Sequence, residues 1–131
     1  MESSVRQAKT VYPTVTPYLI VNNAKGLIDF LQKAFDFKEV TRHLQPDGSI
    51  MHAEVTLGNS LIMLSDASEV YSPNPTMINL FLDDCDSFYR RALDAGAVSI
   101  REPQDQEYGH RSAGVTDQSG NHWWIASDIK G

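Results

Sequence analysis

The sequence is poor in several features that mark other classes of protein. Cys85 is its one cysteine among 131 residues, which excludes an internal disulfide and is typical of a reducing compartment. No apolar run approaches the roughly 20 residues that cross a bilayer, and residues 1–10 are polar, unlike a signal peptide. The net charge of −6 provides no basic stripe for nucleic acid. We therefore expect a cytoplasmic location, with no nucleic-acid partner and no membrane partner.

What the chain does have is an ordinary globular composition, 41% apolar and 21% charged. Its length fits one domain. At this length roughly two-thirds of the surface of the unfolded chain can be buried, which is enough for a core. We expect residues 1–13 to form an N-terminal tail and residues 14–131 to form a single domain.

The second half of the chain repeats the plan of the first. Residues 18–23 read Tyr-Leu-Ile-Val-Asn-Asn and residues 79–84 read Asn-Leu-Phe-Leu-Asp-Asp, 61 positions later. Each half also closes with Gly-Asn, an apolar strand and Ser-Asp, over residues 58–66 and 120–128. A fixed period indicates one supersecondary unit used twice. We expect modules at residues 14–66 and 76–128, with a ligand cavity between them.

Each half reads as a strand, a helix and three further strands. The first helix is indicated by an apolar stripe at i, i+3, i+4, i+7 and i+8, made of Leu27, Phe30, Leu31, Ala34 and Phe35. The second is indicated by Cys85, Phe88, Tyr89 and Ala92, with Gly96 as its end. Strands are expected at residues 14–21, 37–43, 49–57, 60–65, 77–82, 98–102, 112–116 and 121–126. The predicted fold class is therefore α+β, built of two βαβββ modules.

Several local motifs add a family resemblance. They are Thr16-Pro17-Tyr18-Leu19, Asp29-Phe30, Ala34-Phe35, His52-Ala53-Glu54-Val55, and residues 61–66, 108–111 and 117–125. Over residues 14–127 the chain resembles the vicinal oxygen chelate superfamily, which includes glyoxalases, bleomycin-resistance proteins, fosfomycin-resistance enzymes and extradiol dioxygenases. The amino-acid sequence is most similar to the PhnB-like branch. The resemblance implies two curved sheets that form an open, cup-like mixed sheet barrel.

The resemblance also identifies where a metal would bind. Metal-dependent members place His or Glu ligands on cup-facing positions of the first and last strand of each half. Carried over by position, these are Thr16, Met63, Met77 and Trp124, with Ile62 replacing Met63 if the frame shifts by one. A divalent transition metal needs three or four His, Cys, Asp or Glu donors. We therefore expect no metal and no cofactor.

Strand alternation predicts which other side chains line the cup. The predicted ligand pocket comprises Thr16, Tyr18, His52, Glu54, Met63, Met77, Asn79, Phe81, His122 and Trp124, together with Ile20, Thr56 and Leu61 on the same faces. The helix-facing set is Pro17, Leu19, Val21, Ala53, Val55, Ile62, Leu64, Ile78, Leu80, Leu82, Trp123 and Ile125. The first set mixes aromatic, thioether and polar groups, as small-molecule sites do.

Three of these residues have competing interpretations. His52 and Glu54 could form an acid–base pair, but strand positions i and i+2 lie about 7 Å apart, which favours plain pocket polarity. Trp124 could stack on a planar ligand or simply fill the space of the missing metal. The catalytic residues, if there are any, are not identified by the sequence.

Two residues outside the predicted pocket also have alternatives. Arg111 is a possible anion contact, or it pairs with Asp117 or Glu107 to order a loop, and the second is favoured. Cys85 stands at a helix start, where the helix dipole could lower its pKa, but core packing is the better interpretation because no base is placed beside it.

The favoured function is metal-free binding of a small apolar or aromatic molecule, as in the bleomycin-resistance type. One alternative is a metal-dependent lyase, isomerase or thiol transferase of the glyoxalase class. Another is a regulatory or interaction subunit with a vestigial pocket. A homodimer is expected, because edge strands at residues 14–21 and 77–82 need covering and the resemblance implies a paired assembly.

Overall fold

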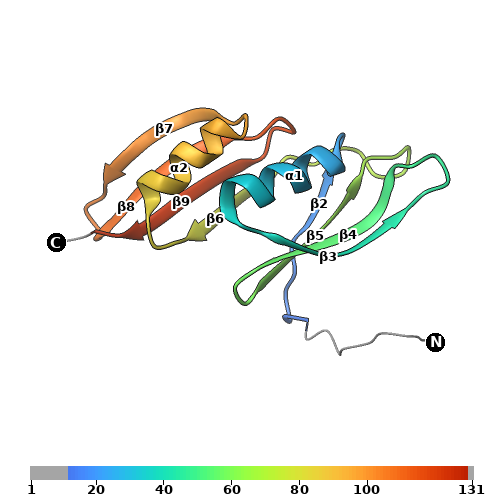
Figure 1. Ribbon diagram of the computed structural model, residues 1–131, viewed down its shortest axis with the longest axis horizontal. Coiled ribbons are helices and arrows are strands. Elements are labelled where there is room, and N and C mark those ends of the chain that lie inside the picture. Colours follow the sequence, from blue (N-terminus) through green and yellow to red (C-terminus); the bar gives the residue numbers. More distant parts are fainter. Residues whose placement is uncertain (1–11, 130–131) are drawn as a thin grey trace.

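The computed structural model describes residues 12–129, and its two sheets each carry one helix (Figure 1). The first module has the sheet order β2-β5-β4-β3, with β2 parallel to β5 and the other pairs antiparallel. Its elements are β2 (Tyr18–Val21), α1 (Ala24–Phe35), β3 (Lys38–Leu44), β4 (Ile50–Leu57) and β5 (Ser60–Asp66).

The second module repeats this topology. Its sheet order is β6-β9-β8-β7, again with the first strand parallel to the last. Its elements are β6 (Met77–Phe81), α2 (Cys85–Asp94), β7 (Val98–Asp105), β8 (His110–Thr116) and β9 (His122–Asp128). The predicted α+β class with two βαβββ modules is confirmed.

The two helices begin alike because the repeated polar pair supplies an N-cap in each. The Asn23 side chain accepts a hydrogen bond from Gly26 N at 3.1 Å, and the Asp84 side chain accepts one from Ser87 N at 3.2 Å. The chain leaves α1 through Asp36, which has a left-handed φ of 66°.

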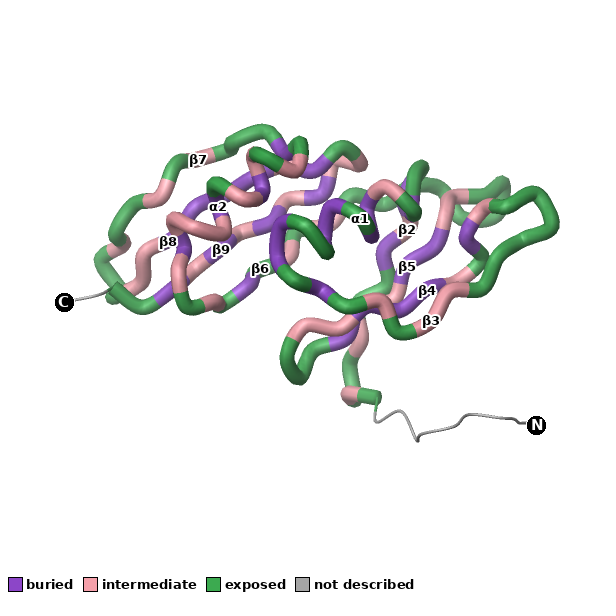
Figure 2. The backbone as a smooth tube through the Cα atoms, in the orientation of Figure 1, coloured by how far each residue is buried: buried purple, intermediate pink, exposed green. Residues whose placement is uncertain are grey.

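The core lies between each helix and the sheet beneath it. Leu19, Ala53, Val55, Leu64, Trp123 and Ile125 are all buried there, on the side where alternation predicts them. Trp123 is fully buried, packs against the rings of Phe35 and Phe37, and donates its indole N–H to Asp117 at 2.8 Å. Figure 2 shows the buried segments mainly in α1 and in the central strands β4, β5, β8 and β9, whereas most loops and the outer strand β7 are largely exposed.

The modules meet through their helices. α1 packs on α2, and Arg91 of α2 donates to the Asp36 carboxylate at 2.6 and 3.0 Å and to Lys33 O at 2.8 Å. The hydrogen bond from Arg91 lowers the pKa of Asp36. Because the helices occupy one side of each sheet, the opposite faces stay open, and the described residues form no closed barrel.

The element boundaries differ most from the prediction in two places. β2 begins at Tyr18, so Thr16, predicted on this strand, precedes it; Pro17 has no N–H for a ladder. β7 and β8 form a longer hairpin than expected, with its tip at residues 106–109, where Gly109 N donates to Gln106 O at 3.1 Å. The expected tail lies outside the described residues except for Tyr12 and Pro13. No helix within residues 12–129 is long and apolar enough to cross a membrane.

Candidate functional site

The open face of the first sheet carries a row of four side chains, one from each strand. Tyr18 pairs with Met63, Met63 with Glu54, and Glu54 with Thr41. Paired residues in neighbouring strands project to the same face. The structure therefore brings together Tyr18, Glu54 and Met63 of the predicted pocket, with His52 two positions along β4.

A hydrogen-bonded chain connects three of these groups. Tyr18 Oη lies 3.1 Å from His52 Nδ1, and His52 Nε2 lies 2.9 Å from Glu54 Oε2. The Tyr12 hydroxyl also donates to Glu54, at 3.1 and 3.2 Å. The backbone spacing made a contact between His52 and Glu54 look remote; it exists because both long side chains lean toward each other along β4.

A hollow of about 640 Å³ lies beside these hydrogen-bonded side chains, at one end of the first sheet. Its wall includes Tyr18 and Ile20 from β2, Met51 from β4, and Val70 and Tyr71 from the loop that follows β5. The lining is thus mostly apolar, with a few polar residues such as Ser65 and Asp66, which is the usual composition of a small-molecule site.

The open face of the second sheet carries the equivalent row with different chemistry. Asn79 pairs with Trp124, Trp124 with Gly114, and Gly114 with Arg101. The indole of Trp124 lies so close over Gly114 that an added Cβ would stand 2.6 Å from the ring. The Arg101 guanidinium carbon lies 5.1 Å from the indole centroid, within the range of a cation–π contact.

Arg101 is a site residue that the sequence did not identify. Its Nη2 donates to both Ser112 oxygens, and its buried Nε has no hydrogen-bond partner in the structure. No sequence pattern identifies Arg101 as a site residue. Its contact with Trp124 reaches across the intervening strand β8, at a position where a glycine has no side chain. His110 is a second residue outside the predicted pocket, and its ring lies 5.0 Å from that of Phe81.

These groups surround a second hollow of about 560 Å³. Four residues of the predicted pocket line it, namely Met77, Asn79, Phe81 and Trp124, together with Arg101, His110 and Tyr108. His122 pairs with Met77 on the same sheet face. The predicted residues therefore form two groups on two sheets, and whether either group binds a ligand stays a prediction.

Arg111 is engaged in ion pairs outside these hollows. It donates to Asp86 at 2.6 and 3.1 Å and to Asp105 at 3.0 Å, and these hydrogen bonds raise its pKa. Its partners are therefore Asp86 and Asp105, and the proposed pairing with Asp117 or Glu107 was wrong. The carboxylates hold the hairpin of β7 and β8 against α2.

Cys85 is buried in the core and donates its thiol to Ile125 O at 3.3 Å. Burial, reinforced by the nearby Asp86 charge, raises the pKa of the thiol from its ordinary 9.0 to about 11. A raised pKa disfavours the reactive thiolate. The core-packing interpretation of Cys85 therefore fits, and the helix dipole does not activate it.

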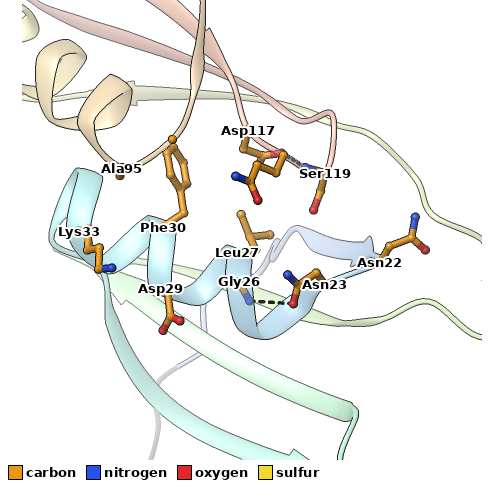
Figure 3. Close-up of a pocket in the computed structure, with 12 residues that line it drawn as sticks. Asn22, Asn23, Gly26, Leu27, Asp29, Phe30, Lys33, Ala95, Asp117 and Ser119 are labelled. Atoms are coloured by element: carbon orange, nitrogen blue, oxygen red, sulfur yellow. Dashed lines mark hydrogen bonds between the residues drawn. The ribbon is translucent and has the colours of Figure 1, made fainter.

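A third hollow, of about 260 Å³, lies between α1 and the turn that precedes β9 (Figure 3). Asp117 lines it, but this buried carboxylate accepts N–H groups from Ser119, Asn121 and the Trp123 indole. Asn121 in turn accepts the N–H of Thr76 at 2.9 Å. The first part of the conspicuous motif, residues 117–121, therefore builds a turn and holds the inter-module linker in place.

The side chains do not suit the divalent metal of the resembled enzymes. The described part of the chain brings no three His, Cys, Asp or Glu side chains together in a group that could hold an ion. The positions carried over from the family are Thr16, Met63, Met77 and Trp124, which offer one hydroxyl, two thioethers and an indole. Such donors do not hold zinc, nickel or manganese.

Comparison with known proteins places this architecture in a family. Residues 11–125 match the sequence model of the Glyoxalase/Bleomycin resistance protein/Dioxygenase superfamily. An uncharacterized protein of Mycobacterium bovis is 34% identical over 94% of this chain and 88% of its own length. An uncharacterized protein of Mycobacterium tuberculosis shows the same identity over 79% of its length.

Solved structures repeat the fold at lower identity. TioX from Micromonospora sp. ML1 superposes with a TM-score of 0.75 at 23% identity, covering 87% of this chain and 97% of TioX. A PhnB protein from Bacillus cereus, named as a putative 3-demethylubiquinone-9 3-methyltransferase, gives 0.71 at 16% identity, covering 88% and 99%. At these sequence identities, the similarity shows a shared fold alone.

Proposed function

The chain belongs to the glyoxalase/bleomycin resistance protein/dioxygenase superfamily, and from this premise we propose that it is a metal-free binding protein for small planar molecules. The fold supplies two curved sheets with open faces. Function on such a scaffold depends on the side chains of those faces. The proposal therefore rests on what the open faces carry, and the family supplies only the frame.

The observation that carries the proposal is the second hollow. Its floor is the indole of Trp124, held against Gly114 on one side and beside the Arg101 guanidinium. Phe81 and Met77 stand on the neighbouring strand and are each 59% exposed. Large apolar side chains left open around a fixed aromatic floor favour a flat, apolar ligand, and Asn79 offers an amide to orient it.

The rival metal-dependent enzyme needs donors that the four carried-over positions lack. A glyoxalase-type lyase, isomerase or thiol transferase depends on a Lewis-acidic ion, and the four carried-over positions hold no imidazole or carboxylate. The vestigial-pocket alternative is disfavoured for another reason. Trp124 folds back onto Gly114 instead of filling the space above the sheet, and about 560 Å³ stays open.

A second copy of the chain would complete the site. Within one chain, each hollow is a half-cup with an open side, and β2 and β6 are outer strands of their sheets. The linker covers part of β2, where Asn74 N donates to Ile20 O at 3.0 Å. A homodimer would cover the remaining edges and apolar surface, bringing an open face of one protomer against that of its partner.

Native mass spectrometry of freshly purified protein tests this function. It reports the mass of the assembly, any bound ion and any co-purified small molecule in one spectrum. The proposal expects a dimer without metal that releases an apolar or aromatic molecule when it is denatured. A stoichiometric transition metal would contradict the proposal and support the enzyme alternative.

A further inference from the structure

The two open faces share one backbone plan but differ in their ionisable side chains. Ligand binding by itself does not require this difference. The second sheet has Asn79, Ser112 and Gly114 at the positions where the first sheet has Tyr18, His52 and Glu54, as the paired registers show. Three side chains that can exchange protons are therefore joined in the first module and absent at the equivalent positions of the second.

The hydrogen bonds in the first module have a direction. An ionised Glu54 can only accept, so His52 Nε2, 2.9 Å away, carries the proton of that hydrogen bond. His52 Nδ1 is then the accepting nitrogen, and the Tyr18 hydroxyl, 3.1 Å away, donates to it. With its own proton pointed at His52, the Tyr18 oxygen offers lone pairs to whatever lies in the adjoining hollow.

Burial follows the same direction. Tyr18 is 41% exposed, the His52 side chain 27% and the Glu54 side chain 6%. The series of hydrogen bonds thus runs from Tyr18, at the wall of the 640 Å³ hollow, to the buried carboxylate of Glu54. Tyr12 also donates to both Glu54 oxygens, so the carboxylate at the inner end accepts hydrogen bonds from two side chains.

We propose that Tyr18, His52 and Glu54 form a proton relay, and that the ligand of this hollow is a planar molecule with an acidic hydroxyl, a phenol or an enol. This inference rests on the proposed binding function and names the ligand class. On binding, the ligand O–H bond breaks and its electron pair stays on the ligand oxygen. The proton passes to Tyr18 Oη while the Tyr18 proton passes to His52 Nδ1.

This transfer conserves protons and charge. The ligand becomes an oxyanion that accepts a hydrogen bond from Tyr18, and His52 becomes an imidazolium paired with Glu54. Among the described residues, His43 on β3 also faces His52, with ring centroids 6.5 Å apart and its Nε2 3.3 Å from Thr41 Oγ1. His43 lies outside the chain of hydrogen bonds, so it serves as the matched control.

The test uses 4-nitrophenol, whose neutral and ionised forms have different absorption bands, and its methyl ether 4-nitroanisole. At a pH where the free phenol is mostly neutral, the wild-type protein should bind it as the phenolate. Calorimetry in buffers of different ionisation enthalpy should show no proton released to solvent, because His52 keeps it. A site that merely selects the anion would release that proton, and this result would overturn the relay.

The variants locate the effect. Tyr18→Phe and His52→Gln should lower the bound phenolate fraction by about tenfold or more, equivalent to one pKa unit or more, while His43→Gln keeps the band. Circular dichroism confirms that each variant folds. Equal binding of both probes with the phenol still neutral would overturn the relay and leave the binding function standing. Failure of both probes to bind would overturn the relay and count against the binding function as well.

Discussion

The indole of Trp124 occupies the space above Gly114 that any other residue would fill with its own side chain. A Cβ at Gly114 would lie 2.6 to 2.7 Å from three atoms of the six-membered ring. Gly114 is therefore required for close approach rather than for an unusual backbone angle. The contact holds the indole against β8, and the Arg101 guanidinium lies over the same ring.

Gly114→Ala should displace the indole and cost about 1–3 kcal/mol of unfolding free energy, the usual effect of overpacking a close contact. In a Trp124→Ala background the same change should cost almost nothing, because the ring that opposes the methyl group is gone. Denaturant unfolding of the two single variants and the double variant measures this coupling. Additive costs would show that Gly114 and Trp124 do not constrain each other.

Dialysis against Ni²⁺ or Zn²⁺ followed by elemental analysis should leave no stoichiometric ion on the protein. The reason is the donor set at the carried-over positions, of which Met63 and Trp124 are examples. One retained ion per wild-type chain would revive the metalloenzyme alternative.

Sedimentation velocity at micromolar concentration should show a particle of twice the chain mass of 14.6 kDa. The physical reason is the exposed apolar surface of Tyr18, Met77 and Phe81 on β2 and β6, the outer strands of their sheets. Phe81→Glu, which places a charge on that surface, should shift the equilibrium toward monomer. A wild-type monomer throughout the concentration series would contradict the dimer.

Cys85 should make stability fall at alkaline pH. Its pKa of about 11 in the folded protein exceeds the 9.0 of a free thiol, so the unfolded chain loses this proton first. The stabilising contribution is complete below about pH 9 and declines as the pH rises toward 11, by about 2–3 kcal/mol in total. Cys85→Ser removes the titrating group, so chemical unfolding from pH 8 to 11 should show a smaller decline than in the wild type. Equal declines would mean that other groups cause the loss.

The architecture was predictable because it depends on local periodicities. The apolar stripe from Leu27 to Phe35 has the helical period, and strand alternation put Leu19 and Trp123 on the buried side. The repeat then fixed the topology, since one module implied the other. The boundaries failed where the sequence is polar, as in residues 103–111, because a hairpin beyond the core has no apolar alternation to mark it.

The candidate site was predictable in part. Alternation placed Tyr18, Glu54 and Trp124 on open faces, but it gives no information about contacts across a sheet. The neighbourhood of Arg101 and Trp124 depends on the register of β7, β8 and β9 and on the missing side chain at Gly114. The hydrogen bond from His52 to Glu54 depends on rotamers, which backbone spacing underestimates. The cation–π neighbourhood and the hydrogen bond both support the proposals, and neither has a recognisable pattern in the sequence.

The adjacent tryptophans test the central claim, that ligands bind on the open sheet faces, most directly. Ligand-induced fluorescence quenching and thermal stability should be measured for Trp123→Ala and Trp124→Ala with a planar apolar probe such as 4-nitroanisole. Trp124→Ala should keep its melting temperature and bind several-fold more weakly, since one stacking contact is worth on the order of 0.5–1.5 kcal/mol. Trp123→Ala should lose about 3–5 kcal/mol of stability. If Trp123→Ala instead abolishes binding at an unchanged melting temperature while Trp124→Ala unfolds the protein, the assignment of the two faces is contradicted, and with it the binding site.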